Sequence, residues 1–247
     1  MLREERQGYI LNQIQLHHKV RTTDICSALK VSLDTVRRDL AELEKEGRLR
    51  KVHGGAISTA FHYPFQQTEI YARDKKQTIA RKALQLITDN MVLLLGGGTV
   101  MLELARMIPE NLKGTIFTVS PLVALEIAQR STVEVLLLAG KVARNSYICT
   151  GSSVIRQLSE IQADLCFLGT NGLSVREGIT DHDWEVVQIK KSMLQSAKKS
   201  AVLSISEKLG SVQNLQVCNL ISIDYLVTEL PRSDDRLKPF GTICKVI

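Results

Sequence analysis

The first sixty residues predict three amphipathic helices, because apolar residues recur there at spacings of three and four. Residues at these spacings share one face of a helix, and the polar residues between them fall on the opposite face. The three apolar stripes consist of Tyr9, Ile10 and Ile14; Ile25 and Leu29; and Val36, Leu40 and Leu43. The pattern therefore predicts a small helical domain whose helices pack through these faces.

A very short connection, residues 30–32, joins the second and third of these helices. Ser32 can accept hydrogen bonds from the free N–H groups at the start of the third helix, and Thr22 or Thr23 can do the same for the second. Two helices joined by so few residues have the spacing of a helix-turn-helix.

A basic extended segment follows the third helix. Gly47 can end this helix because glycine accepts a left-handed backbone conformation. In residues 48–52 basic side chains are interleaved with apolar ones, as in a half-buried strand, and Gly54-Gly55 predicts a hairpin turn. The helices and the hairpin together predict a winged helix-turn-helix domain.

From residue 75 onward, apolar runs alternate with segments of helical periodicity. The runs lie at residues 91–95, 115–119, 133–138, 165–168, 201–205 and 225–228. The helical segments are one that starts at Lys75 and those at residues 100–108, 121–130, 152–161 and 185–198. This alternation is typical of an α/β domain with a largely parallel sheet.

The change of pattern predicts the division of the chain. We expect a winged helix-turn-helix domain at residues 1–57, a linker at residues 58–74 and an α/β domain at residues 75–247. The linker mixes polar residues and a proline without a steady period. Because its aromatic residues alternate, both a free linker and a docked extended strand remain open; these residues are Phe61, Tyr63 and Phe65.

Composition excludes several classes of protein. A hydrophobic content of 44% in 247 residues suits aliphatic cores, and no apolar run approaches the roughly 18 residues that a membrane span needs. The five cysteines form no CxxC pair, and the adjacent His17 and His18 point to different faces of a helix. We therefore expect a cytoplasmic protein with no disulfide framework, no metal and no cofactor.

The placement of charge says more than the net charge of +6. Between Arg37 and Lys51, six basic residues stand among four acidic ones, which favour the middle of the segment. A solvated, salt-bridged helix would show the same mixture. The helix-turn-helix spacing favours instead a helix whose N-terminal end enters the major groove of DNA, followed by a basic hairpin that contacts phosphates.

The predicted DNA contacts fall into two groups. Side chains near the start of the third helix are candidate readers of base edges, and basic side chains of the hairpin are candidate phosphate contacts. The DNA-binding candidates are Thr22, Ser32, Leu33, Asp34, Thr35, Arg37, Arg38, Arg48, Arg50, Lys51 and His53.

Four polar loops follow the predicted strands, where ligands bind in open α/β sheets. The first, residues 96–99, combines three glycines with a helix start, whose free N–H groups suit a phosphate. The second includes Ser120, the third spans residues 169–172 with residues 178–180 behind it, and the fourth holds Lys208. Each loop alone has an ordinary turn as an equal alternative, but together they predict one anion-binding site.

In one register, the predicted DNA-binding segment resembles the DeoR family of bacterial transcriptional regulators. The matching residues are Ser32, Thr35, Arg37, Arg38, Asp39, Leu40, Leu43, Gly47, His53, Gly54, Gly55 and Ala56. The resemblance extends over nearly the full chain and implies an effector domain similar in fold to ribose-5-phosphate isomerase, with a phosphorylated sugar as ligand. The effector-binding candidates are Gly96, Gly97, Gly98, Thr99, Ser120, Gly169, Thr170, Asn171, Gly172, Thr180, Glu185 and Lys208.

The chain departs from the family pattern in these loops. Gly96 and Ile205 stand where the family usually has aspartates. Val119 and Val100 stand where asparagine and threonine are common. These replacements leave open a reduced effector site, a site for a different ligand, or no effector at all.

An isomerase would need a carboxylate base beside its ligand. Asp181, Asp183 and Glu185 are the candidates, but the losses at Gly96 and Ile205 and the DNA-binding domain favour a regulator. We predict a homo-oligomeric repressor of carbohydrate-metabolism genes, a dimer or larger, which a phosphorylated sugar or related metabolite releases from its double-stranded DNA operator. The alternatives are a sugar-phosphate isomerase-like enzyme and a constitutive DNA-binding protein with a degenerate effector site.

Overall fold

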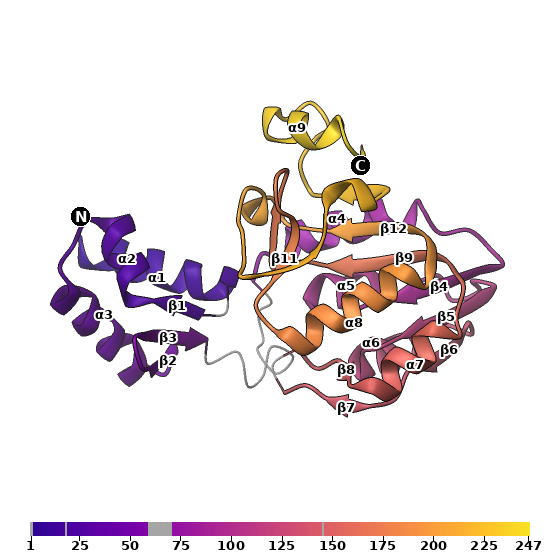
Figure 1. The fold of residues 1–247 in the computed structure, drawn as a ribbon, viewed down its shortest axis with the longest axis horizontal. Helices are drawn as coiled ribbons and strands as arrows, with labels where there is room; N and C mark the ends of the chain where they lie inside the picture. The colour runs from indigo at the N-terminus through magenta and orange to yellow at the C-terminus, as the bar shows by residue number, and fades with distance from the viewer. Residues whose placement is uncertain (1, 18, 59–70, 145) are drawn as a thin grey trace. The chain divides into compact units, whose positions relative to one another are not determined.

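The computed structural model describes residues 2–17, 19–58, 71–144 and 146–247. The chain divides into two compact units, the N-terminal unit Met1–Tyr71 and the C-terminal unit Ala72–Ile247. Figure 1 gives the order of the helices and strands along the chain. Most of the predicted linker, with its alternating aromatic residues, lies outside the described residues, as does His18.

Three helices and a three-stranded antiparallel sheet form the N-terminal unit. Its elements are α1 (Arg3–His17), β1 (Lys19–Arg21), α2 (Thr22–Leu29), α3 (Leu33–Lys45), β2 (Leu49–Val52) and β3 (Gly55–Ser58). The strands lie in the order β1-β3-β2. The three predicted helices are confirmed, whereas β1 was not predicted, because a strand of three residues is too short to show a period.

The start of α2 differs from the prediction. Arg21 lies opposite Gly55 in the β1–β3 pair, so the chain is extended up to Arg21 and enters α2 directly at Thr22. No side chain caps this helix start, and Thr22 is buried. The predicted cap by Thr22 or Thr23 is therefore wrong, because strand pairing places the start of α2.

The hairpin turn between β2 and β3 lies one residue earlier than predicted. Val52 pairs with Gly55, so Gly55 begins β3 and the turn consists of His53 and Gly54. Gly54 has a φ of 76°, which favours glycine. A Cβ on Gly55 would lie 2.0 Å from the carbonyl oxygen of Val20, so this glycine lets β1 approach.

The apolar stripes of the three helices meet in one core, as predicted. Ser32 caps α3, since its Oγ accepts a hydrogen bond from the N–H of Thr35 at 3.2 Å. Gly47, with a φ of 71°, follows the end of α3. The buried residues of this core are Ile10, Ile14, Val20, Ile25, Val36, Leu40, Leu43, Leu49 and Ala56.

A seven-stranded sheet forms the centre of the C-terminal unit. In spatial order its strands are β15 (Lys245–Val246), β14 (Tyr225–Val227), β12 (Ala197–Leu203), β9 (Ala163–Gly169), β4 (Met91–Leu95), β5 (Gly114–Thr118) and β6 (Glu134–Leu137). Every neighbouring pair is parallel. Each of the six predicted apolar runs overlaps one of these strands, which confirms the α/β class, and β15 is additional.

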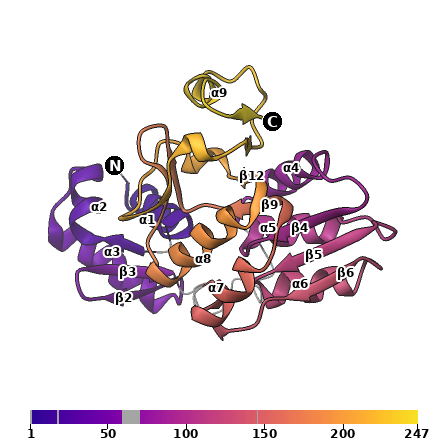
Figure 2. The ribbon, with the colours of Figure 1, turned by 45° about the vertical axis from the view of Figure 1, so that its right-hand side comes forward.

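Helices cover both faces of this sheet, as Figure 2 shows. One face carries α4 (Arg73–Leu84), α5 (Thr99–Met107) and α6 (Pro121–Ala128), and the other carries α7 (Ser152–Ser159) and α8 (Trp184–Gln195). The second face buries a core that includes Leu94, Leu138, Val154, Leu158, Cys166, Leu168, Ile189 and Met193. Each sheet face is therefore shielded from water, which explains why the strands read as continuous apolar runs.

Small antiparallel sheets complete the C-terminal unit. β7 (Lys141–Val142) pairs with β8 (Cys149–Thr150), and β11 (Gly178–Asp181) lies between β10 (Gly172–Ser174) and β13 (Leu215–Cys218). These strands of two to four residues were not predicted. Much of the predicted third loop is therefore a β10–β11 hairpin.

Short helical elements fill the remaining connections. They are the 3-10 turns η2 (Ser206–Lys208), η3 (Leu220–Ser222) and η4 (Asp235–Leu237) and the short helix α9 (Lys238–Gly241). Within the described part of the chain, no helix combines the length and apolar character needed to cross a membrane.

Candidate functional site

The predicted recognition helix presents a polar face beside its buried stripe. Leu33, Asp34, Arg37 and Arg38 are exposed. Arg37 lies 3.8 Å from Asp34, whereas Arg38 makes no ion pair with any described residue. Thr35 is half-buried and is occupied by the cap of α3, since its Oγ1 lies 2.9 Å from that of Ser32. The side chains free to meet a ligand are therefore those of the exposed first turns of α3.

The hairpin β2–β3 carries the second group of candidates. Leu49 is buried in the core, and Arg50 and Lys51 are exposed on the same strand. Arg48 and His53 are exposed at the two ends of β2, with Arg48 3.6 Å from Glu46. Thr22, by contrast, is buried, and its N–H donates to a turn carbonyl oxygen, so its side chain lies away from the exposed surface.

Two acidic residues of α3, Asp39 and Glu42, contact α1 instead of this basic surface. Asp39 is 2% exposed and accepts two hydrogen bonds from the guanidinium of Arg6, at 2.8 and 3.0 Å. These bonds raise the pKa of Arg6. Glu42 pairs with Arg3 and accepts from Gln7 on α1. The salt-bridged alternative therefore applies to the side of α3 that contacts α1 and to the exposed Asp34–Arg37 pair, whereas Arg38 makes no ion pair with any described residue.

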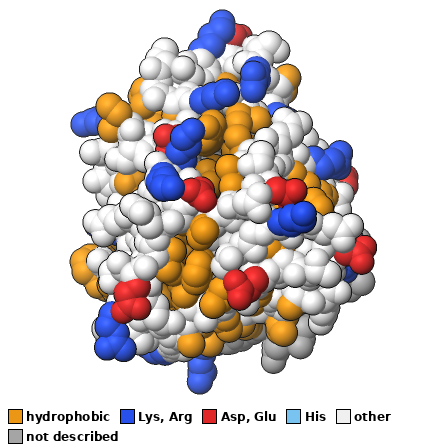
Figure 3. Space-filling view, turned by 90° about the vertical axis from the view of Figure 1, so that its right-hand side faces the viewer, with side chains coloured by type: hydrophobic (Ala, Val, Ile, Leu, Met, Phe, Trp, Pro, Cys, Tyr) orange, Lys and Arg blue, Asp and Glu red, His pale blue; other side chains and the backbone are white. Residues whose placement is uncertain are grey.

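This basic surface differs from the part of the C-terminal unit seen in Figure 3. There, exposed hydrophobic side chains are mixed with scattered charges of both signs. A duplex that carries one negative charge about every 1.7 Å attracts concentrated positive charge. The exposed basic residues of α3 and the β2–β3 hairpin therefore form the candidate nucleic-acid surface.

Because of the strand order, the four candidate loops of the C-terminal unit lie at the same end of the sheet. β12, β9, β4 and β5 are neighbours and parallel, so their carboxyl ends lie together. The loops touch as well: a Cβ on Gly169 would lie 3.5 Å from the carbonyl oxygen of Gly97. The strand order of the sheet therefore brings the four candidate loops together.

The loop after β4 leaves the start of α5 open. Gly98 precedes α5 with a φ of 103°, and no side chain caps that helix start. A Cβ on Gly97 would lie 2.3 Å from Cγ2 of Ile148, so glycine is needed there. Thr99 is the first residue of α5, and Gly96 is fixed by a 3.0 Å bond from its N–H to the carbonyl oxygen of Phe167. The open N–H groups of α5 suit an anion.

Several hydroxyl groups that were predicted to bind the effector already form hydrogen bonds within the protein. The Oγ of Ser120 accepts from the N–H of Val123 at 3.5 Å and so caps α6. Thr170 donates from Oγ1 to the carbonyl oxygen of Gly172 at 2.6 Å. Thr180 accepts through Oγ1 from the N–H of Gln213 at 2.9 Å. These hydroxyls shape the loops.

Lys208 joins the loop after β12 to the loop after β9. The residue is half-buried, and its Nζ donates to the carbonyl oxygen of Thr170 at 2.5 Å and to the amide oxygen of Asn171 at 3.4 Å. Both acceptors are neutral, and no described carboxylate lies within ion-pair distance of Nζ. Burial, together with the charges of Lys76 and Lys190, lowers the pKa of Lys208 to about 7. An ammonium in this position is stabilised by any anion that reaches it.

A buried ion pair is connected to Lys208 through Asn171. Asp181, which is fully buried, accepts from Nζ of Lys190 at 2.6 Å and from the amide of Asn171 at 2.9 Å. Burial alone would raise the pKa of Asp181, but Lys190 and Asn171 bring it well below its usual range. Lys190 was not among the predicted residues, because no local pattern reveals a pair that joins β11 to α8.

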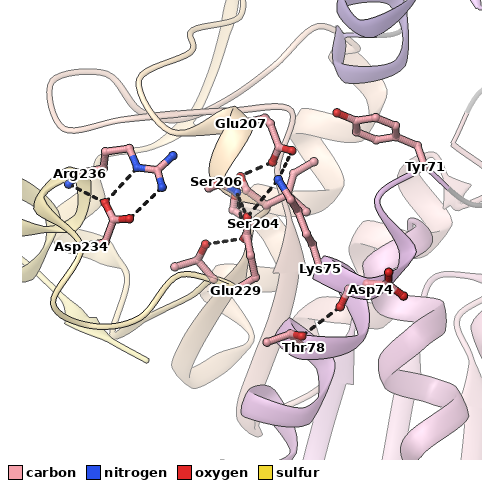
Figure 4. A network of polar contacts seen from close by, with 12 residues as sticks. Tyr71, Asp74, Lys75, Thr78, Ser204, Ser206, Glu207, Glu229, Asp234 and Arg236 are labelled. Carbon is pink, nitrogen blue, oxygen red and sulfur yellow. Dashed lines mark hydrogen bonds and ion pairs between the residues drawn. The ribbon is translucent and has the colours of Figure 1, made fainter.

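The first turn of α4 adds two more lysines that the sequence did not single out. Lys76 is buried, and burial lowers its pKa to about 8 against the opposing charges of Glu103 and Glu207. Lys75 forms an ion pair with Glu207 on η2 and lies 3.7 Å from Glu229 (Figure 4). The turn that carries Lys208 is thereby joined to the start of α4.

Glu185 belongs to a different group of contacts from Lys208. It is exposed on α8, accepts from Oγ1 of Thr150 at 3.1 Å and lies 3.3 Å from Nζ of Lys141. No group of three or more His, Cys, Asp or Glu side chains among the described residues could hold a metal ion. The groups suited to an anion at this end of the sheet are therefore the amine of Lys208, the amide of Asn171 and the open N–H groups of α5.

Comparison with known proteins agrees with both halves of the molecule. Residues 6–60 match the DeoR-like helix-turn-helix domain, and residues 72–230 match the DeoR C terminal sensor domain. The HTH-type transcriptional repressor GlcR of Bacillus subtilis (strain 168) is 33% identical, over 93% of this chain and 89% of its own. The HTH-type transcriptional regulator GolR of Listeria innocua is 28% identical, over 91% and 90%.

Among solved structures, ribose 5-phosphate isomerase A from Methanocaldococcus jannaschii is similar to part of the chain. It has a TM-score of 0.41 and 19% identity, and the match covers 55% of this chain and 54% of the isomerase. The two domain matches together span nearly all of the described residues. On this evidence the chain belongs to the DeoR family of transcriptional regulators.

Proposed function

We propose that this regulator is a repressor of carbohydrate-metabolism genes that binds a double-stranded DNA operator and leaves it when a phosphorylated sugar or related metabolite binds. The exposed start of α3 would read base edges, and the hairpin β2–β3 would contact phosphates. Family membership, the names of the relatives and the exposed basic side chains support this proposal. Because the proposed partner is DNA, we expect the protein in the cytoplasm.

The contacts of Lys208 support the effector-binding part of the proposal most directly. A half-buried ammonium whose contacts are neutral oxygens is costly unless an anion joins it. The open start of α5 offers N–H groups to the same kind of ligand. A phosphate bound there would pair with Lys208, and the sugar hydroxyls would meet Asn171 and the backbone of the loops.

The regulation follows from linkage between the two ligands. An effector that binds more tightly to the form with low operator affinity shifts the protein toward that form. The operator and the effector then weaken each other's binding by the same factor. An operator with two-fold symmetry is matched by a homo-oligomer, so the proposed regulator acts as a dimer or a larger assembly.

An isomerase is less well supported, because the candidate bases are engaged by other residues of the fold. A general base must accept a proton from the substrate. Asp181 is buried against Lys190, which keeps its pKa low. Asp183 caps α8 by accepting from its backbone, and Glu185 is engaged by Thr150 and Lys141. Conversion of ribose 5-phosphate to its ketose by the full chain would support the enzyme instead.

The third reading, a constitutive DNA-binding protein, is favoured by two apolar replacements. Ile205 is buried, and Gly96 faces the backbone of Phe167, so neither position offers a side chain to sugar hydroxyls. The presence of Lys208 argues that the effector-binding site is not fully degenerate.

A release assay separates these readings. Duplexes that the protein selects from a random library serve as operator probes, and fluorescence anisotropy follows binding as ribose 5-phosphate, glucose 6-phosphate, fructose 1-phosphate or inorganic phosphate is added. We expect one sugar phosphate to release the wild type, and Lys208→Met to bind the probe normally but resist release. No selected duplex would contradict DNA binding, and no release by any compound would favour the constitutive reading.

A further inference from the structure

Strand β6 ends the seven-stranded sheet with an edge that no described strand covers. Its inner side pairs with β5, where Thr118 lies opposite Leu137 and the N–H of Leu138 donates to Thr118 at 2.9 Å. Peptide groups of a strand point alternately to its two sides, so the N–H and C=O groups of Val135 and Leu137 point outward. Two residues of the edge are therefore ready to pair with another strand.

The outward edge is closed at its end by a side chain. Gln157 on α7 accepts from the N–H of Ala139 at 3.2 Å and donates to its carbonyl oxygen at 2.9 Å. Gln157 thus completes the hydrogen bonds of one outward residue and leaves those before it open. The open part of the edge is centred on Leu136.

The side chains around this edge are apolar on both faces of the sheet. Leu136 and Leu137 are 39% and 41% exposed and point to opposite faces. A strand edge flanked by exposed leucines, with no charge after Glu134, is the kind of edge that proteins cover.

We propose that this edge is the interface with a second copy of the chain, formed by antiparallel pairing of β6 with β6 of the partner about a two-fold axis at Leu136. In this register each Val135 exchanges hydrogen bonds with Leu137 of the other copy, and Leu136 faces its own counterpart. The only two open residues of the edge are thus complementary to each other, as a two-fold interface requires.

Charge agrees with this register. Glu134, the charged residue of β6, falls opposite Leu138 of the other copy, so no like charges oppose each other within the paired strands. The pairing makes one continuous sheet of the two C-terminal units and places two DNA-binding units in one molecule, as two half-sites of an operator demand.

A disulfide at the axis tests the register. Residues that face each other in a non-hydrogen-bonded pair have Cα atoms about 4.5 Å apart, within the range of a disulfide. Under mild oxidation of the full chain, Leu136→Cys is expected to form a covalent dimer in high yield. Glu134→Cys is the matched control, because its counterpart would lie about 14 Å away along the strand.

The native cysteines set the background of this experiment. Cys26 and Cys218 are partly exposed, so the unsubstituted chain is oxidised in parallel. Cross-linking of Leu136→Cys no stronger than that of Glu134→Cys or of the unsubstituted chain would overturn the proposed register.

Sedimentation velocity tests the interface without cysteine. Leu136→Lys places two ammonium groups face to face and is expected to raise the dissociation constant of the dimer at least tenfold. Because residue 136 is already partly exposed, circular dichroism should show an unchanged fold. Ile221→Lys, at a residue that is 80% exposed elsewhere in the unit, is expected to leave association unchanged. A monomeric wild type at tens of micromolar, or a Leu136→Lys dimer as tight as the wild type, would overturn the proposal.

Discussion

Nζ of Lys190 lies 2.6 Å from Oδ2 of Asp181, although the two residues come from α8 and β11. Their side chains are 13% and 1% exposed, so the pair is shielded from water. The other carboxylate oxygen accepts from Asn171 and from the N–H of His182. This pair therefore fixes the loop after β9, which carries Asn171, to the hairpin and to α8.

Removal of the carboxylate from this pair should destabilise the protein strongly. Asp181→Asn leaves the ammonium of Lys190 buried without its charged partner, and breaking a buried pair in this way costs about 3–5 kcal/mol. Urea unfolding followed by circular dichroism measures the loss. Asp235→Asn is the control, since the Asp235–Lys238 pair is exposed on both sides and should contribute less than about 1 kcal/mol. Equal stability of the two variants would contradict this account.

The same pair predicts a loss of stability in acid. The pKa of Asp181 is well below its usual range because of Lys190, whereas an unfolded aspartate titrates near pH 3.9. The stabilisation is therefore fully present above about pH 4 and is lost as the pH falls toward the folded pKa. Urea midpoints of the wild type should fall more steeply between pH 5 and 3 than those of Asp181→Asn. Parallel curves would show that Asp181 does not titrate as described.

Lys208 predicts that anion binding takes up a proton. Its pKa of about 7 leaves much of the amine neutral at pH 7.5, and an anion beside Nζ favours the ammonium form. Calorimetric titration at pH 7.5 with sulfate, whose own charge is constant there, should give different heats in buffers of different protonation enthalpy. Lys208→Met should bind more weakly and show no such difference. Identical heats for the wild type in both buffers would contradict proton uptake at this lysine.

Much of the fold could be predicted, because its signals are local. The stripe Val36, Leu40 and Leu43 and the cap at Ser32 are set by residues a few positions apart, and both are confirmed. The buried strands of the large sheet appear as continuous apolar runs for the same reason. β10 and β11 gave no such signal, because strands of three or four residues depend on partners elsewhere in the chain.

The charges of the sites were harder to predict, because a charged residue's partner is set by the fold. Asp39 looks like a surface residue of α3 in the sequence, yet it is buried against Arg6, 33 positions earlier. The role of Lys190 likewise depends on its ion pair with Asp181, which lies on another element. Residue type and spacing could place Lys208 after a strand, but not reveal that its acceptors are neutral.

The ion pair between Lys75 and Glu207 should carry the effector signal to the start of α4. Glu207 precedes Lys208 on η2, so a ligand that moves Lys208 also acts on Lys75. Because Lys75 is 42% exposed, Lys75→Met should cost less than about 1 kcal/mol of stability. We expect the variant to bind sugar phosphate in calorimetry but to be released less readily from its DNA probe. Thr78→Ala, on the same helix but outside this pair, should respond as the wild type; wild-type release in Lys75→Met would rule out this route.

The two groups of DNA contacts should respond differently to salt and to sequence. Arg38 lies exposed on α3 and Arg50 on the hairpin strand β2. If Arg38 reads a base, Arg38→Ala costs about 1–3 kcal/mol on the selected duplex and relaxes the preference at one position. Arg50→Ala should weaken all duplexes alike and lower the slope of log affinity against log salt by about 0.9, the value for one lost phosphate contact.

Anisotropy titrations between about 50 and 200 mM KCl, on the selected duplex and its single-position variants, distinguish these outcomes. Arg176→Ala, whose side chain is 93% exposed in the C-terminal unit, controls for the loss of one positive charge. If Arg38→Ala and Arg50→Ala both behave like this control, α3 and the hairpin do not face the DNA. If both lower the salt slope without any change in base preference, α3 contacts the backbone, and the sequence must be read by its other exposed residues or through the shape of the DNA.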